Sequence, residues 1–315
     1  MFKPEKFVDE QIEEMRAKIK GKAIIACSGG VDSTVAAVLV SRAIGDQLLT
    51  VYVNNGFMRK GETEEVGKMF DSLGINYRLI DASDEFFDAL KGVTEPERKR
   101  KIIGERFIRV FERTAKEYGA EYLVQGTIAP DWIESGDGVR DVIKSHHNVG
   151  GLPKDINMTL VEPLRDLYKD EVRKVARYLN VEVAERQPFP GPALAIRVLG
   201  EPTREAVEIV REACAIVEEE IEKASEEGRM ERPWQYFAVL LPCQSVGVQG
   251  DNRAYGRTIA VRSVESIDGM SASYSKIPHE VLEHISVRIT NEMKSDVNRV
   301  VYDITHKPPG TVEWE

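Results

Sequence analysis

The chain has 315 residues, and 43 lysines and arginines stand against 53 aspartates and glutamates, which gives a net charge of −10. This length is typical of two domains, each with its own core. An acidic chain lacks the basic surface that binds nucleic acid, so we expect no nucleic-acid partner. No apolar run approaches the ~20 residues that span a bilayer, and residues 1–10 are too charged for a secretory signal. The composition therefore predicts a cytoplasmic chain with no membrane partner.

The first part of the chain alternates between short apolar runs and stretches with helical spacing. Such alternation is typical of a doubly wound parallel sheet with helices on both faces, that is, an α/β fold. Ligands of these sheets bind beyond the carboxyl ends of the strands. The expected strands are 23–27, 48–53, 77–80 and 122–125, and the expected helices are 34–44, 62–73, a short one from residue 83, and 102–114.

The periodicity is lost between residues 126 and 164, a segment rich in Gly, Asp, Ser and His, and a helix is expected again at 170–179. Three prolines between residues 188 and 192 favour a domain boundary there. We therefore expect one domain over 1–189 and a smaller α+β domain over 190–315. The elements expected in the second domain are helices 203–227 and 278–293 and strands 237–241, 258–264 and 297–303.

The sequence SGGVDST, residues 28–34, follows the first expected strand and precedes a helix. Its glycines allow a sharp turn, and the helix that follows offers free amides and the positive end of its dipole to an anion. The pattern predicts a phosphate site, although a glycine turn with polar caps is the simpler alternative. It is not a Walker A loop, because GxxxxGK[ST] is absent. The seven residues are Ser28, Gly29, Gly30, Val31, Asp32, Ser33 and Thr34.

Asp32 is an acidic residue inside this expected anion site, where it would repel a bare phosphate. It is therefore predicted to meet a bound Mg²⁺ or to orient the loop.

The string resembles the PP-loop of the N-type ATP pyrophosphatases, which split ATP between its α and β phosphates. Further segments, from about residue 20 to the last residue, are similar to GMP synthetase. One departure falls at Gln187 and Ala193, where many members of that family have His and Gly. The segments that carry the resemblance are 99–104 (KRKIIG), 125–128 (QGTI), 143–153 (IKSHHNVGGLP), 188–192 (PFPGP), 245–251 (SVGVQGD) and 307–315 (KPPGTVEWE).

The resemblance implies a reaction in two steps that needs ATP and Mg²⁺. The C2 oxygen of xanthosine monophosphate (XMP) attacks the α-phosphorus of ATP, which gives adenylyl-XMP and pyrophosphate. Ammonia then displaces AMP, and the product is GMP. Such catalysis depends mainly on positioning the reactants and neutralising phosphate charge.

Roles for individual residues follow from the same resemblance. Residues 28–34 would bind the ATP phosphates, with Asp32 near the metal and as a catalytic residue. Val53 would lie near adenine or be a plain core valine, and Lys144 would clamp phosphate as a second catalytic residue or be a solvated lysine. The residues implied for XMP are Arg100, Asp131, Glu134, Asp251, Lys307 and Glu313, of which Asp131 and Glu134 could instead be Mg²⁺ ligands or plain surface carboxylates.

The source of ammonia is the last point that the sequence addresses. A glutaminase domain needs a nucleophilic cysteine in a Gly-x-Cys-x-Gly elbow or at the N-terminus, and Cys27, Cys214 and Cys243 have neither context. The chain thus resembles the synthetase subunit of a split enzyme, whose partner would be a separate glutamine amidotransferase subunit. The family also implies a homodimer through the C-terminal domain.

Three other readings stay open at this point. NAD synthetase does not account for residues 188–315. A tRNA-thiolating enzyme would favour paired cysteines and a basic surface. A non-catalytic adenine-nucleotide-binding regulator would form no AMP from Mg·ATP.

Overall fold

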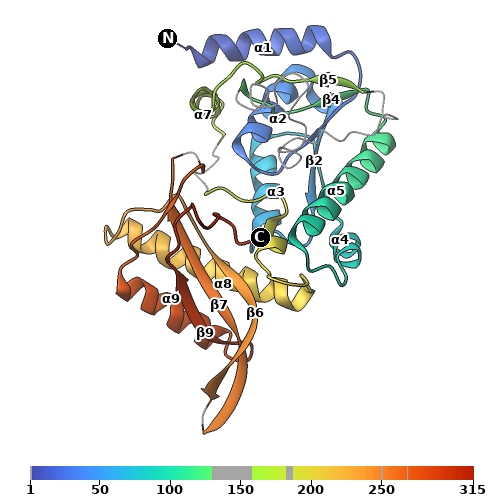
Figure 1. The fold of residues 1–315 in the computed structure, drawn as a ribbon. Coiled ribbons are helices and arrows are strands. Elements are labelled where there is room, and N and C mark those ends of the chain that lie inside the picture. The colour runs from blue at the N-terminus through green and yellow to red at the C-terminus, as the bar shows by residue number, and fades with distance from the viewer. Residues whose placement is uncertain (1, 130–157, 182–186, 250, 268) are drawn as a thin grey trace. The chain divides into compact units, whose positions relative to one another are not determined.

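The structure is a computed structural model that describes residues 2–129, 158–181, 187–249, 251–267 and 269–315 (Figure 1). The chain forms two compact units. The first comprises Met1–Gly56, Gly61–Ser83 and Gly104–Arg186. The second comprises Phe57–Lys60, Asp84–Ile103 and Gln187–Glu315, so it includes two segments that precede residue 189.

The first unit contains a parallel five-stranded sheet in the order β3-β2-β1-β4-β5. Its central strand, β1, is apolar throughout and almost fully buried, as expected for a strand covered on both faces. This confirms the α/β class predicted from the alternating pattern. The strands are β1 (Ala23–Ala26), β2 (Leu48–Asn54), β3 (Tyr77–Asp81), β4 (Tyr122–Val124) and β5 (Thr159–Val161).

Helices flank this sheet, and α2 (Val31–Ile44) packs against β1, β2 and two further helices, α1 (Pro4–Lys18) and α7 (Lys169–Tyr178). Residues Thr34–Val40 of α2 are all buried, which explains why its sequence is apolar nearly all round. Within the described part of the chain, no helix is long and apolar enough to cross a membrane. The other helices of the first half of the chain are α3 (Glu62–Leu73), α4 (Ser83–Ala89) and α5 (Pro96–Tyr118), with a 3₁₀ turn, η1, at Gly45–Gln47. Of these, α4 from Asp84 on and α5 up to Ile103 belong to the second unit.

Strand β5 lies inside the segment 126–164 for which the sequence showed no periodicity, so that expectation was wrong at this point. The strand has only three residues, which is too short for a period to be recognised. It exists because it pairs with β4, with Tyr122 opposite Thr159 and Val124 opposite Val161.

The second unit has a four-stranded sheet built on a long antiparallel hairpin, β6 (Gln235–Gln249) and β7 (Asn252–Glu265). Strand β7 also pairs with β8 (Ser273–Tyr274) and, in parallel, with β9 (Val297–Asp303). Helices α8 (Arg204–Glu226) and α9 (His279–Glu292) pack against β6 and β9 respectively and against each other. A 3₁₀ turn, η2 (Ala193–Ile196), follows the proline segment, and the whole is the α+β arrangement expected for the second domain.

Both hairpin strands are longer than the sequence predicted, because their outer halves are mostly exposed and contain no continuous apolar run. Val246, Val248 and Tyr255 project from this outer part and are 46%, 77% and 68% exposed. Asn298 of β9 braces the arm: its side chain donates to Ser245 O at 2.7 Å, and its Oδ1 accepts from Ser245 Oγ at 2.7 Å. A contact between side chains that are distant in sequence cannot be predicted from the local hydropathy pattern.

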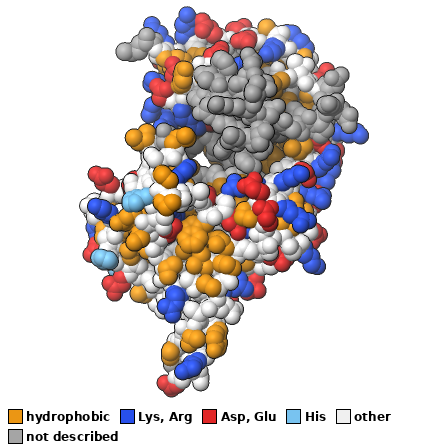
Figure 2. Space-filling model, viewed as in Figure 1, with side chains coloured by type: hydrophobic (Ala, Val, Ile, Leu, Met, Phe, Trp, Pro, Cys, Tyr) orange, Lys and Arg blue, Asp and Glu red, His pale blue; other side chains and the backbone are white. Residues whose placement is uncertain are grey.

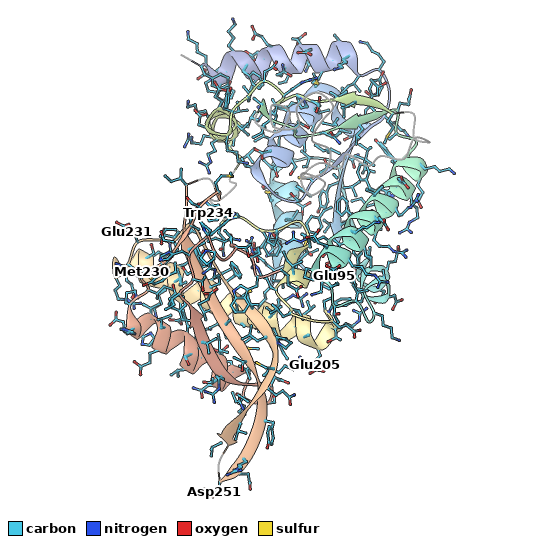
Figure 3. The ribbon with its side chains drawn as sticks, viewed as in Figure 1. Glu95, Glu205, Met230, Glu231, Trp234 and Asp251 are labelled. Carbon is cyan, nitrogen blue, oxygen red and sulfur yellow. The ribbon has the colours of Figure 1, made fainter. Side chains whose placement is uncertain are left out.

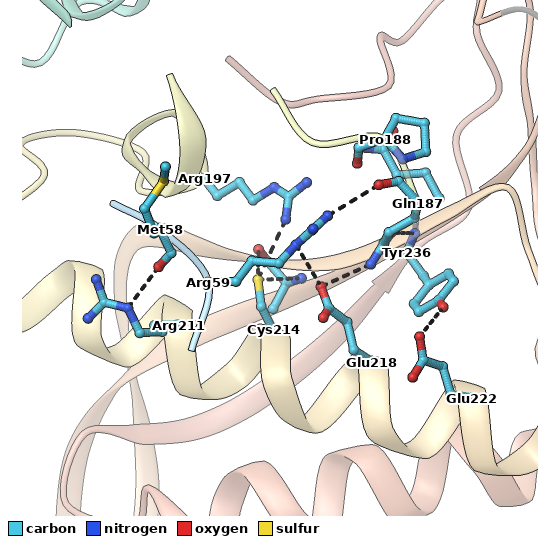
Figure 4. A network of polar contacts seen from close by, with 12 residues as sticks. Met58, Arg59, Gln187, Pro188, Arg197, Arg211, Cys214, Glu218, Glu222 and Tyr236 are labelled. Atoms are coloured by element: carbon cyan, nitrogen blue, oxygen red, sulfur yellow. Dashed lines mark hydrogen bonds and ion pairs between the residues drawn. The ribbon is translucent and has the colours of Figure 1, made fainter. Parts of the chain in front are cut away.

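The departure from the family pattern at Gln187 has a structural counterpart within the second unit (Figure 4). The Gln187 side chain donates to Glu218 at 2.9 Å and accepts from the Tyr236 amide at 2.7 Å. Its carbonyl oxygen accepts from Arg59, which also forms an ion pair with Glu218. Gln187 thus links α8, β6 and the segment 57–60.

Candidate functional site

The phosphate loop lies where the strand order of the first unit reverses. Strands β2 and β3 follow on one side of β1, whereas β4 and β5 follow on the other. A parallel sheet opens a crevice at the carboxyl ends of its strands at such a point. Residues 27–30 leave β1 there and enter α2, and the Cys27 amide still donates to Val51 O of β2 at 2.9 Å.

Two glycines allow the backbone to approach closely at this edge. Gly29 has φ +79°, and a Cβ atom on it would lie 2.8 Å from Cγ2 of Val66. Gly126, directly beyond β4, packs against the loop from the other side. A Cβ atom there would lie 3.0 Å from main-chain atoms of Asp32 and Ser33. The loop conformation therefore depends on both positions being glycine.

The start of α2 has the features of an anion site. Its N-cap is Gly30, which has no side chain, so no side chain caps the first amides of the helix. The hydroxyls of Ser33 and Thr34 donate to Gly30 O at 3.2 and 2.8 Å and fix the turn. Amides of a helix N-terminus that lack a side-chain acceptor favour phosphate oxygens as partners.

Asp32 lies in the first turn of α2, and its two carboxylate oxygens have different surroundings. Oδ2 accepts from Nζ of Lys169 at 2.5 Å, and the two side chains are 27% and 47% exposed. Oδ1 is buried and has no hydrogen-bond partner among the described residues. Carboxylate oxygen is the ligand type that Mg²⁺ prefers, so Oδ1 fits a metal ion. Among the described residues, no group of three or more His, Cys, Asp or Glu side chains could hold a metal ion.

Lys169 belongs to this site, and sequence reasoning missed it. It is the first residue of α7, where the helix dipole disfavours a cation. Because Asp170 and Glu171 follow it in the same turn, the local sequence gave no signal of a distant anion. Only the packing of α7 against α2 shows that the anion is Asp32 of the phosphate loop.

Val53 and Cys27 are buried beside the loop. Val53 is next to last in β2 and 2% exposed, so its side chain is part of the core in this structure. The Cys27 thiol lies 3.4 Å from Ser33 Oγ, and burial raises its pKa. A thiol with a raised pKa is a poor nucleophile at neutral pH.

In the second unit, Lys307 and Glu313 both lie in the last segment of the chain. The Lys307 main chain pairs with Ala272, and its Nζ donates to Gly269 O at 2.7 Å. Glu313 accepts two hydrogen bonds from Arg197, at 3.1 and 2.9 Å, and one from Gln235 at 3.0 Å. A carboxylate offers about four acceptor sites, so Glu313 retains room for roughly one further donor.

Two other residues implied for XMP, Arg100 and Asp251, lie in other parts of the second unit. Arg100 donates to the main-chain oxygen of Glu315, close to the end of the same segment. Asp251 lies at the tip of the β6–β7 hairpin, whereas Trp234 marks the opposite end (Figure 3). Lys307 pairs with Ala272, two residues before Tyr274, and Tyr274 pairs with Val264 of β7. Val264 and Asn252, the neighbour of Asp251, are 12 residue steps apart on β7, which is ~40 Å at the usual strand rise. One nucleotide cannot contact both Asp251 and Lys307 of one chain.

Three further residues that the sequence singled out, Asp131, Glu134 and Lys144, lie outside the described residues.

Two family descriptions match separate parts of the chain. The NAD synthase family description matches residues 2–120, and the description "GMP synthase C terminal domain" matches residues 219–314. A solved structure of NMN synthetase from Francisella tularensis is 16% identical, with a TM-score of 0.48 over 66% of this chain and 82% of that one.

Relatives of high identity extend over the whole chain. A protein from Methanopyrus kandleri, named as a subunit of GMP synthase (glutamine-hydrolyzing), is 63% identical over 100% of both chains. The protein of the same name from Pyrococcus abyssi is 61% identical over 99% of each. GMP synthase (glutamine-hydrolyzing) from Clostridium tetani is 56% identical, and the match covers 98% of this chain but 61% of that one.

A phosphate loop at the switch point of a parallel sheet, together with the match to NAD synthase, defines a PP-loop ATP pyrophosphatase. This class of enzyme is joined here to a C-terminal domain of the GMP synthase type. The chain belongs to the family of GMP synthase (glutamine-hydrolyzing) subunits that includes the Methanopyrus and Pyrococcus proteins.

Proposed function

We propose that this chain makes GMP from XMP, ATP and ammonia in two steps. The C2 oxygen of XMP attacks the α-phosphorus of ATP and releases pyrophosphate, and ammonia then displaces AMP from adenylyl-XMP. The observation that carries the proposal is identity of 61–63% over essentially the full length to two proteins named as GMP synthase subunits. We place the reaction in the cytoplasm.

The phosphate loop supplies the binding groups for the first step. The amides at the start of α2 and the ammonium group of Lys169 would bind the pyrophosphate part of ATP and stabilise the charge that develops on it. Asp32 would hold Mg²⁺ through Oδ1, and the metal when bound supplies further neutralisation of phosphate charge. Lys169 would then exchange the carboxylate of Asp32 for a phosphate oxygen. Lys144 is proposed as a second phosphate clamp, and Val53 as a wall of the adenine site.

The second unit is proposed to bind XMP. Lys307 offers a charge for the phosphate, and Glu313 can still accept one N–H group of the purine. Arg100 donates one N–H to the main-chain oxygen of Glu315, and its guanidinium group has further N–H donors that would contact the phosphate. Asp131 and Glu134 are further proposed contacts of XMP.

A homodimer is proposed through the second unit. Hydrophobic side chains gather over strands β6 and β7 and again near the end of their hairpin (Figure 2). Exposed apolar groups of this kind mark contact surfaces. A second copy would also account for Asp251, which is too far from Lys307 in its own chain to meet the same nucleotide. Sedimentation of the purified chain tests the dimer, and a monomer at micromolar concentration would refute it.

The ammonia is proposed to come from a separate glutamine amidotransferase subunit. The chain spans 61% of the Clostridium tetani relative, so that protein has a further part without a counterpart here. None of the three cysteines lies in a Gly-x-Cys-x-Gly elbow, and two of them are buried. This chain should therefore use ammonium directly and glutamine only with its partner.

One assay tests the proposal and separates it from its rivals. The chain is incubated with Mg·ATP, with and without XMP, and with either ammonium or glutamine as nitrogen donor. We expect AMP, pyrophosphate and GMP only when XMP and ammonium are both present, with higher rates at alkaline pH, where more of the ammonia is unprotonated. ADP and orthophosphate as products would refute the pyrophosphatase reaction. Sustained GMP formation from glutamine alone would refute the separate subunit.

A further inference from the structure

The last segment of the second unit, residues 304–315, has neither helix nor strand, and we term it the C-terminal strap. A segment of this kind needs specific contacts to hold one conformation, because each ordered residue costs about 1–2 kcal/mol of backbone entropy. Three cations supply these contacts. Their side chains are 0%, 0% and 1% exposed, and they are Lys99, Arg197 and Arg262.

Lys99 anchors the end of the strap. Its ammonium group donates to the Glu315 side chain, to Val198 O at 2.7 Å and to Ala195 O at 3.3 Å. All three hydrogens of the ammonium group therefore have a partner. The next residue, Arg100, donates to the Glu315 main chain, so two successive cations of α5 hold one strap residue.

Arg197, the residue directly after η2, anchors Glu313. Its guanidinium donates through two nitrogens to the two carboxylate oxygens, at 3.1 and 2.9 Å, which is the bidentate geometry of strong Arg–carboxylate pairs. The guanidinium also stacks on Phe237, 4.0 Å from the ring centroid, and on Phe189 at 5.1 Å. The position of Glu313 is thus fixed by a side chain that is itself immobilised.

Arg262 of β7 shapes the middle of the strap. It donates to the carbonyl oxygens of Thr305 at 2.6 Å and Thr311 at 2.8 Å, and it pairs with Asp303 at the end of β9. These bonds close the strap into a loop that contains Lys307. Lys307 and Glu313, the two residues proposed to meet the nucleotide, are therefore both held by contacts with buried cations.

Buried ion pairs contribute little net stability, because the cost of desolvating both charges offsets their attraction. Burial lowers the pKa of Lys99 and raises that of Glu315, which are both shifts toward the neutral forms, whereas the pKa of Arg197 is raised despite its burial, because Glu313 stabilises its charge. The Lys99–Glu315 pair is therefore poorly explained as a stabiliser of the fold, and both buried pairs have a second consequence. They do define a single geometry for the strap, since a buried charge tolerates few alternative positions.

We propose that Lys99 and Arg197 are positioning residues, which hold the C-terminal strap in the one conformation that binds the nucleotide substrate. Lys99 and Arg197 would act through the strap, without contacting the nucleotide themselves. This inference rests on the proposed use of XMP. It predicts that loss of either pair affects the use of XMP and leaves the binding of ATP unchanged.

The test compares Lys99→Met with Lys101→Met, an exposed neighbour on the same helix. Four quantities are measured: the apparent KM for XMP, kcat, the affinity for Mg·ATP without XMP, and hydrogen exchange of a peptide covering residues 304–315. We expect Lys99→Met to raise the KM by at least ~10-fold and to expose the strap to exchange, with kcat within about threefold and unchanged ATP affinity. Lys101→Met should change none of the four.

A second variant distinguishes positioning from a general loss of structure. Lys99→Met combined with Glu315→Leu replaces the ion pair by apolar groups of similar volume, which buried sites often accept. We expect the KM and the exchange protection to return to within about threefold of the unaltered chain. If Lys99→Met does not fold, Arg197→Lys takes its place, because lysine keeps the charge and loses the bidentate fork.

The outcomes separate this inference from the proposed function. A strap that stays protected in Lys99→Met, or a KM that does not recover in the double variant, overturns the positioning role. An exposed strap with an unchanged KM also overturns it, while GMP formation in the same assay still supports the proposed reaction. An unaltered chain that forms no GMP from XMP and ammonium would refute the proposed function itself.

Discussion

The two units of this chain build their polar sites in opposite ways. In the first unit the proposed phosphate site is built on seven consecutive residues at the end of one strand, and Lys169 of α7 is the one distant side chain that joins them. In the second unit the strap depends on pairs that are distant in sequence, since 216 residues separate Lys99 from Glu315 and 116 separate Arg197 from Glu313. The first site is made largely of backbone and is fixed by local conformation, whereas the second is made of side chains and is fixed by burial.

This difference implies different sensitivities to substitution. A backbone site fails when the backbone can no longer adopt its turn or when the one charge that complements it is lost. A side-chain site fails when a buried charge loses its partner, and it recovers when both partners are replaced. The following predictions test how the backbone site of the first unit, and then single residues of both units, respond to substitution.

The largest effect is expected from Asp32→Ala in the phosphate loop. The variant should fold, because Asp32 is partly exposed, and should lose at least ~10²-fold in XMP-dependent AMP formation, as is typical when one preorganised electrostatic group is removed. The measurement is the initial rate at saturating Mg²⁺. Glu64→Ala, an exposed carboxylate in the first turn of α3, is the matched control and should retain full activity. A near-normal rate for Asp32→Ala would show that Asp32 only orients the loop.

Gly126→Ala tests the backbone character of the site without altering any charge. Its Cβ atom would lie 3.0 Å from main-chain atoms of Asp32 and Ser33, so the loop must shift. We expect a loss of about 1–3 kcal/mol in the free energy of unfolding, as for other overpacked sites, and weaker ATP binding. Denaturant unfolding and equilibrium binding measure the two effects. Gly104→Ala in α5, where a Cβ atom meets nothing within 4 Å, should be neutral or slightly stabilising. Equal effects of the two substitutions would contradict the close approach.

Ala193→Gly is expected to stabilise the second unit slightly. Ala193 has φ +55°, a left-handed conformation that is strained for alanine, at a position where the family pattern has glycine. Relief of this strain, about 1–2 kcal/mol for a left-handed residue, exceeds the entropic cost of glycine, about 0.5–1 kcal/mol. The midpoint of denaturant unfolding should rise, with an unchanged slope. A lower midpoint would mean that the buried Cβ atom contributes more through packing than the strain costs.

The smallest effect is expected in the reactivity of the three cysteine thiols, two of which are buried and one exposed. Burial raises the pKa of Cys27 and of Cys214, so neither provides much thiolate at pH 8, whereas Cys243 is exposed. A chromogenic disulfide reagent should label one thiol rapidly and the other two only after unfolding. Cys243→Ser should remove the rapid phase. Rapid labelling of Cys27 would instead show that the end of β1 opens readily.

The sequence predicted the parts of the fold that have a strong local signature. The buried strands, helix α2 and strand β9 at Val297–Asp303 all follow from the hydropathy pattern. Strand β5 and the outer halves of β6 and β7 were missed because pairing, rather than a local hydrophobic pattern, defines them. In the candidate site, the turn after β1 and the helix that follows it were predicted, and phosphate binding by residues 28–34 stays a prediction. The contact of Lys169 was not predicted, since the aspartate that it meets is distant in sequence.

The sequence by itself determined the phosphate loop, because φ freedom at Gly29, the hydroxyls of Ser33 and Thr34 and the helix that follows are all properties of neighbouring residues. It also determined the family, through segments spread along the chain. Only the tertiary structure decided that Lys169 faces Asp32 and that Glu313 faces Arg197. The physical reason is that an ion pair depends on the distance between two charges and on the water excluded around them, and neither quantity exists until the elements have packed.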